Sequence, residues 1–305
     1  MSFQNSLKKL VPLGPLFIII AATLWALDGI LRRSLYTLPP LTIVFYEHLI
    51  GSLLLIPLFL KEKKIQYTLS LISLLVLVSL LSGLLGTLWF TTALIKVNFI
   101  SFSVVLLLQK LQPLFATSAA VIFLKEKITK RYAIWAILAI IAAYFVTFKN
   151  GVVNAGTDQA TIIAALYAVG AAAAWGSSTA ISKLVLNKVS STAATALRFF
   201  ITSILAFGAL VIFLPAEALT SVTPSQMTRF FGIALSTGMV ALYLYYKGLK
   251  TTQAKISTIL ELVFPVLGVI IDAVLYKNFL APTQLLAAVI LLFAVFKTAQ
   301  LNRKH

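Results

Sequence analysis

Hydrophobic residues gather in long stretches along the chain, and short polar breaks separate about ten such stretches from one another. A helix needs about 20 apolar residues to cross the hydrocarbon core of a membrane. A membrane β-barrel would need alternating segments of about half that length, which the sequence lacks. The pattern predicts an all-α integral membrane protein with transmembrane helices at 14–34, 42–60, 69–94, 102–124, 132–149, 160–182, 191–214, 229–249, 256–276 and 281–298.

The second half of the chain repeats features of the first half at an offset of about 150 residues. The recurring landmarks are Trp25 with Trp175, His48 with Arg198, and Pro113 with Pro265. Internal self-similarity in an apolar chain is typical of transporters built from two repeats. Because each repeat holds an odd number of spans, we expect two inverted five-helix repeats, 1–149 and 150–305, with no soluble domain.

Composition and charge placement support membrane insertion. Of 305 residues, 60% are hydrophobic and 11% are charged, and the mean hydropathy is +1.01. The net charge of +17 suggests nucleic-acid binding at first sight, but its distribution excludes that class. With the N-terminus inside, roughly seventeen basic residues fall in inner loops against about six outside, Arg32 and Arg33 among the latter. This asymmetry predicts a bacterial-type cytoplasmic membrane protein with both termini in the cytoplasm.

Enzyme and metal chemistry find little support in the sequence. The chain has no cysteine and only two histidines, His48 and His305, so neither a disulfide nor a metal site is expected. No phosphate-binding loop, nucleophile elbow or zinc-protease motif occurs. We expect no bound cofactor and no enzymatic activity.

Charged residues inside the predicted spans are the main candidates for function, because burying a charge in hydrocarbon costs at least about 2.5 kcal/mol. They are Asp28, Glu47, Lys110, Arg198 and Glu261. Such side chains normally face the bundle interior and mark a substrate or ion path, although mutual ion pairing that only locks helices together would place them there too. The titratable groups Glu47, His48 and Glu261 are candidates for proton coupling.

Lys110 and Glu261 carry most weight, because they precede Pro113 and Pro265 at matching positions of the two repeats. A proline inside a helix frees a backbone carbonyl, and transporters place their sites at such breaks near the bilayer midplane. We therefore expect Lys110 and Glu261 to approach each other. Gln109 and Gln112 flank Lys110, and a continuous helix could not point all three side chains to one face.

Aromatic residues complete the predicted substrate site. Trp25 and Asp28 are three residues apart and share a helix face, which suits a cationic or zwitterionic ligand. Trp89, Trp175 and Tyr243 could wall a cavity, although aromatic residues that face lipid or pack in the core would look the same. Asp272 and Glu126, near span ends, are expected to be solvated.

Together these features resemble the drug/metabolite transporter superfamily, in its ten-helix EamA-type branch. The resemblance rests on the tryptophan in the first helix of each half, the proline turns in LLQKLQPLF and ILELVFPVL, and Glu126 in FLKEKIT. It covers roughly 14–298. The family commonly has an arginine in the second helix of a repeat: Arg198 matches it in the second half, whereas the first half has His48. The counterpart of Glu126 in the second half is Asn278, and Lys110 suggests a distinct subgroup. The resemblance implies alternating access around a central cavity, usually for export.

The predicted function is a secondary transporter of a small polar or amphipathic organic solute, such as an amino acid, a metabolite or an organic cation. Expected partners are that substrate, the lipid bilayer and protons, and the chain is expected to be a monomer or homodimer. A passive channel is the alternative, but the rings of like charge or repeated filter segments that channels use are not seen.

Overall fold

The computed structural model describes residues 13–62, 65–96, 100–116, 118, 129–152, 159–252, 257 and 260–301. Over these residues the structure is all-helical, and each predicted apolar stretch contains a helix. In the described part of the chain, seven helices are long and apolar enough to cross a membrane, and shorter apolar helices cover Phe102–Ala116, Val263–Leu275 and Pro282–Thr298. The predicted all-α fold is thus confirmed over these residues, and the long apolar helices are consistent with a membrane protein. The predicted spans 102–124 and 256–276 extend beyond the described residues, as does Glu126.

The helices follow the chain in two similar series. The first half contains α2 (Leu13–Arg33), α3 (Pro40–Phe59), α4 (Leu69–Val78), η1 (Ser79–Gly86), α5 (Thr87–Ile95), α6 (Phe102–Gln109) and α8 (Lys130–Thr147). After the short η2 (Lys149–Gly151), the second half contains α9 (Gln159–Leu186), α10 (Ser191–Phe213), α11 (Glu217–Thr220), α12 (Pro224–Gly232), η3 (Ile233–Gly238), α13 (Met239–Thr251), α15 (Val263–Leu275) and α16 (Pro282–Leu301).

Polar residues fix several helix starts. The hydroxyls of Thr68, Thr129 and Ser190 accept hydrogen bonds from backbone N–H groups in the first turns of α4, α8 and α10. Thr223 and Gln226 form a reciprocal capping box at α12. These caps satisfy N–H groups that have no partner within the helix, so the loops end where the sequence supplies a short hydroxyl side chain.

Two spans change to π-helical geometry midway. The helical run Leu69–Ile95 is α-helical, then π-helical in η1, then α-helical again, and the run Pro224–Thr251 does the same through η3. Each π-helical segment ends at a glycine, Gly86 or Gly238. π-Helical segments are rare and recur at functional sites, and nothing in the hydropathy pattern reveals them.

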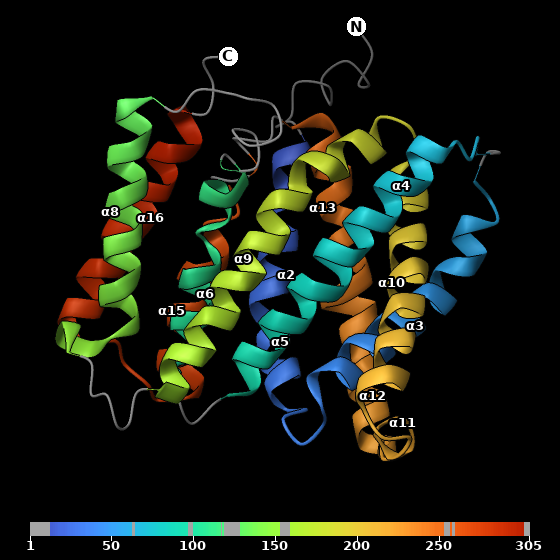
Figure 1. Cartoon of the computed structure of the whole chain (residues 1–305), viewed down its shortest axis with the longest axis horizontal. Coiled ribbons are helices and arrows are strands. Elements are labelled where there is room, and N and C mark those ends of the chain that lie inside the picture. Colours follow the sequence, from blue (N-terminus) through green and yellow to red (C-terminus); the bar gives the residue numbers. More distant parts are fainter. Residues whose placement is uncertain are drawn as a thin grey trace, which may run out of the picture.

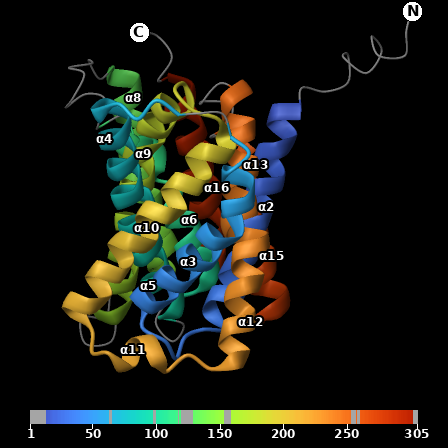
Figure 2. The same ribbon diagram turned by 90° about the vertical axis from the view of Figure 1, so that its right-hand side faces the viewer.

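The two halves interleave. The most extensive helix pairings, α8 with α16, α3 with α10 and α2 with α13, each join one helix of the first half to one of the second. The α8–α16 pair forms one edge of the molecule (Figure 1), and α2 lies along α13 (Figure 2). The start of α2 and the end of α16 lie at the same end of the bundle (Figure 1). Apolar side chains such as Ile134, Ile204 and Val211 are exposed on the outer faces, as contact with lipid requires.

Candidate functional site

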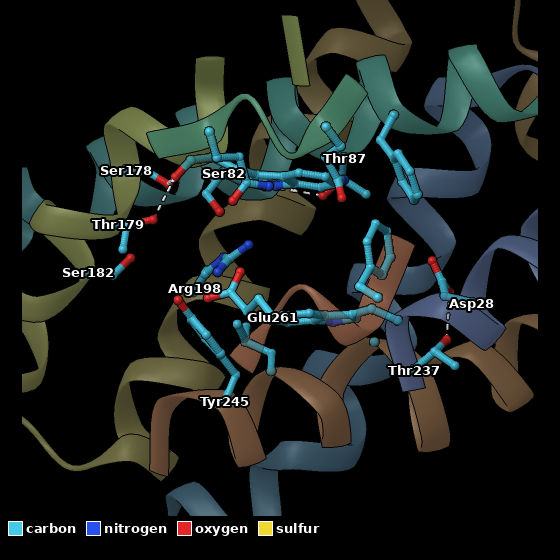
Figure 3. A pocket seen from close by; sticks show the side chains of 18 of the residues that line it. Asp28, Ser82, Thr87, Ser178, Thr179, Ser182, Arg198, Thr237, Tyr245 and Glu261 are labelled. Carbon is cyan, nitrogen blue, oxygen red and sulfur yellow. Dashed lines mark hydrogen bonds between the residues drawn. The ribbon is translucent and has the colours of Figure 1, made fainter. Parts of the chain in front are cut away.

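A cavity of about 130 Å³ lies among α2, α3, α5, α6, α9, α10 and α13, so both halves of the chain line it. Figure 3 shows Asp28 and Thr237 on one side and Arg198, Tyr245 and Glu261 on another. Ten residues singled out from the sequence line this cavity: Trp25, Asp28, Glu47, His48, Gln109, Lys110, Gln112, Trp175, Arg198 and Glu261.

Lys110 and Glu261 form an ion pair, with 3.6 Å between Nζ and Oε2. The Lys110 ammonium also lies 4.8 Å from the centroid of the Phe264 ring. Ser257 donates a hydrogen bond of 3.2 Å to the other carboxylate oxygen of Glu261. The expectation that Lys110 and Glu261 approach each other is confirmed.

The pair sits at two breaks in the helices. α6 ends at Gln109, and Lys110 and Leu111 form a turn before the helix resumes; Glu261 and Leu262 form the turn that precedes α15. The turn explains why Gln109, Lys110 and Gln112 all line the cavity. The prediction that one of them points elsewhere was wrong, because it assumed a continuous helix of 100° per residue.

A second charged cluster joins four elements around Arg32. The Arg32 guanidinium donates to Asp28 Oδ2 at 2.7 Å, to Glu47 Oε2 at 2.9 Å and to Thr91 Oγ1 at 3.0 Å. Thr237 of η3 donates a hydrogen bond to Asp28 Oδ1. Asp28 therefore has partners on both oxygens. It serves this cluster, which ties α2, α3 and α5 to the second half.

Arg198 is held by a tyrosine hydroxyl, whereas Arg32 is held by carboxylates. Its Nη1 donates to the Tyr246 hydroxyl at 3.0 Å, and that hydroxyl lies 3.4 Å from Ser182 Oγ. Its buried Nε has no hydrogen-bond partner among the residues that the structure describes. On α3, His48 Nδ1 lies 2.9 Å from the carbonyl of Val44 and must carry a proton there, so Nε2 is the acceptor when the ring is neutral.

The aromatic residues of the cavity form two groups. The rings of Trp25 and Tyr245 lie 5.1 Å apart, and those of Trp175 and Phe90 lie 5.2 Å apart. Trp175 Nε1 donates at 2.8 Å to the carbonyl of Ser82 in η1. The same carbonyl accepts a hydrogen bond from the Thr87 hydroxyl at 3.2 Å, so a carbonyl in the π-helical segment of the first half orients a cavity tryptophan of the second half.

Comparisons with known proteins fit this architecture. The model of the EamA-like transporter family matches the chain twice, over residues 12–148 and 162–299. The chain belongs to the EamA-like transporter family. The riboflavin transporter ImpX of Fusobacterium nucleatum is 36% identical over 295 residues, covering 95% of this chain and 98% of the relative. A crystal structure at 16% identity superposes with a TM-score of 0.63 over 95% of this chain and 97% of the other, which shows a shared fold alone.

This EamA-like protein is therefore a multi-pass membrane transporter of the drug/metabolite type, and its substrate is a small solute. The family and the relative's name point to a transporter rather than an enzyme.

Two residues expected in the site of this EamA-like chain do not line the cavity. Trp89 packs against α9, where a Cβ added to Gly170 would lie 3.0 Å from its ring. Tyr243 lies beside Lys247, whose Nζ is 5.9 Å from the ring centroid. Helical geometry explains both: Trp89 is two residues from the cavity residue Thr87, and Tyr243 is two from Tyr245, which turns each about 200° away.

Sequence reasoning also misplaced the arginines at the end of α2 and the carboxylate of Asp272. Arg32 and Arg33 were counted as loop residues, but both are buried, and Arg33 donates to the carbonyls of Leu94 and Ile100. Asp272, expected to be solvated, is 1% exposed and accepts hydrogen bonds from Ser103 N and Oγ. It caps the start of α6 from α15. The four-residue spacing of Asp28 and Arg32 was the available signal for the Arg32 cluster.

Proposed function

We propose that this chain transports riboflavin, or a closely related neutral flavin, across the membrane by alternating access. The observation that carries the proposal is the charge balance of the cavity. Three carboxylates (Asp28, Glu47, Glu261) and three cations (Arg32, Lys110, Arg198) line it, so its formal charges sum to zero with His48 neutral. A balanced site favours a neutral solute over an ion, and the riboflavin transporter at 36% identity supplies the candidate.

The rest of the lining suits a flavin, which joins a flat tricyclic aromatic ring to a chain of hydroxyl groups. The Trp25–Tyr245 and Trp175–Phe90 pairs offer aromatic faces for the ring. On α9, Ser178 and Thr179 donate their hydroxyl protons to the carbonyl of Trp175. Their oxygens remain acceptors for the hydroxyls of the substrate.

Alternating access is supported by how the halves contact each other. We propose ten spans in two inverted repeats, such that 14–149 and 160–298 superpose after a half-turn about an axis in the membrane plane. The α3–α10 and α8–α16 pairings join equivalent helices, and η1 and η3 occur at matching places. Burial of Arg32 and Arg33 removes two basic residues from the outer loops. That strengthens the charge asymmetry by which we place both termini in the cytoplasm.

The cavity is smaller than a flavin needs, as expected for a closed stage of a transport cycle. The volume of about 130 Å³ equals that of about four water molecules in the liquid, whereas pockets for drug-sized ligands measure about 300–1,000 Å³. A flavin therefore requires the cavity to widen, which relative movement of the halves would provide.

Purified protein in liposomes tests the proposal. Vesicles loaded with unlabelled riboflavin should accumulate labelled riboflavin by counterflow, and protein-free vesicles should not. Excess amino acids, organic cations and nucleobases should not compete. If riboflavin shows no counterflow and another solute from this panel does, that solute is the substrate in place of riboflavin.

The same vesicles can be used to measure proton coupling and the direction of transport. Glu47, His48 and Glu261 line the cavity, and we retain them as sites of proton exchange. Coupling requires riboflavin to move protons, seen with a pH-sensitive dye, and a pH gradient to drive uphill flux. Export, as the family resemblance implies, requires net flux out of the cytoplasmic face. Equilibration of riboflavin without proton movement would make the protein a facilitator.

A further inference from the structure

Arg198 differs from the other two cations of the cavity, because it has no carboxylate partner in the described part of the chain. Lys110 pairs with Glu261, and Arg32 pairs with Asp28 and Glu47. Arg198 makes no ion pair there, even though it is buried, with only 9% of its surface exposed. A buried guanidinium without a counter-charge is unfavourable, so the cavity keeps one strong donor group in need of an acceptor.

The free part of Arg198 has a defined shape. Nη1 is occupied by the Tyr246 hydroxyl, which Ser182 in turn contacts, and these contacts fix the plane of the guanidinium. Nε has no partner, and no hydrogen bond from Nη2 occurs among the described residues. The N–H groups of Nε and Nη2 share one edge of the guanidinium and point in parallel. That edge matches two adjacent acceptor atoms, as in bidentate arginine recognition.

A flavin carries such an acceptor pair, namely ring nitrogen N1 and the neighbouring carbonyl oxygen O2. We propose that the Nε–Nη2 edge of Arg198 binds N1 and O2 of the flavin and selects substrates with this pair. The assignment rests on the proposed transport of riboflavin and adds how the ring is oriented. It turns the pyrimidine side of the ring toward α10 and Tyr246.

Two flavin analogues test this assignment in the purified protein by isothermal titration calorimetry. In 1-deazariboflavin a C–H group replaces N1, and in 5-deazariboflavin N1 and O2 remain. Because a hydrogen bond to a charged group contributes strongly, the wild type should bind riboflavin about 10- to 100-fold more tightly than 1-deazariboflavin. It should bind 5-deazariboflavin about as tightly as riboflavin.

Arg198→Lys should abolish this preference, since an ammonium keeps the charge but lacks the planar pair of donors. Tyr246→Phe should weaken it by freeing the guanidinium to rotate. Arg131→Lys is the matched control: Arg131 is exposed at the start of α8, and its replacement should leave all three affinities unchanged.

The outcomes separate the two proposals. Equal wild-type affinities for riboflavin and 1-deazariboflavin, or a preference that persists in Arg198→Lys, would overturn the role of Arg198 and leave riboflavin transport standing. Failure of the wild type to bind any flavin would overturn the proposed function and this assignment together. If Arg198→Lys does not fold, the analogue comparison in the wild type decides alone.

Discussion

Removing either member of the Lys110–Glu261 pair should damage stability and transport in ways that a double substitution separates. Lys110→Met leaves the Glu261 carboxylate buried without its cation, and Glu261→Gln leaves the Lys110 ammonium without its anion. The double variant removes both charges. We expect each single change to lower stability, and the double change to restore stability but not transport.

The magnitude follows from the geometry. At 3.6 Å between Nζ and Oε2, and with an effective dielectric constant of about 20, the charges attract by about 5 kcal/mol. The side chains are only 5% and 11% exposed, so solvent screens them little. Breaking such a buried pair destabilises proteins by about 3–5 kcal/mol, whereas replacing both partners is often neutral.

Two measurements on the same preparations check this. Thermal unfolding in detergent should show a lower midpoint for each single variant and a near-wild-type midpoint for the double variant, because the two changes are coupled. Riboflavin counterflow should be lost in all three, since in the proposed cycle the pair breaks and re-forms as the cavity opens. Full transport by Glu261→Gln or by the double variant would show that the pair only holds the helices together. Additive losses of stability would show that the two charges do not interact.

Three further outcomes are expected. Arg32→Met should destabilise the protein by about 3–5 kcal/mol in thermal unfolding, because it strands two buried carboxylates; wild-type stability would show that these carboxylates are not charged. Gly176→Ala should destabilise it, because a Cβ there would lie 2.3 Å from the backbone oxygen of Gln112; in the control Gly208→Ala, the Cβ meets nothing within 4 Å and the change should stabilise by about 0.5–1 kcal/mol. Trp25→Leu should weaken riboflavin binding about 3- to 10-fold in calorimetry through lost stacking, and unchanged affinity would place the flavin ring elsewhere.

The sequence predicts most of the fold because hydrocarbon solvent imposes a simple rule. Every backbone polar group must be satisfied within the helix, so apolar length alone locates the spans. α10, for example, runs Ser191–Phe213 against a predicted 191–214. The matching places of Lys110 and Glu261 before Pro113 and Pro265 also predicted that they approach each other, and they form an ion pair.

Other parts of the site were not predictable, because they depend on local geometry that hydropathy does not encode. The turn at Lys110 and Leu111 changes which side chains face the cavity, and the π-helical η1 directs the Ser82 carbonyl to Trp175. Arg32 was missed because an arginine in the last turn of a span has the same sequence pattern whether it meets solvent or faces the bundle. Only the position of α3, which brings Glu47 to it, decides that.

The contacts at the cavity that join the two halves are also the contacts that its widening would disturb first. Lys110 and Asp28 belong to the first half, and they bind Glu261 and Thr237 of the second. Trp175 of the second half donates to Ser82 of the first. If the halves rock against each other, these three links stretch while the contacts within each half persist. A substrate that supplies its own acceptors and aromatic surface can replace part of what these links provide, so its binding would lower the barrier to movement of the halves. Binding and transport are then coupled through the same side chains, which is why a change at Lys110 or Glu261 should affect both.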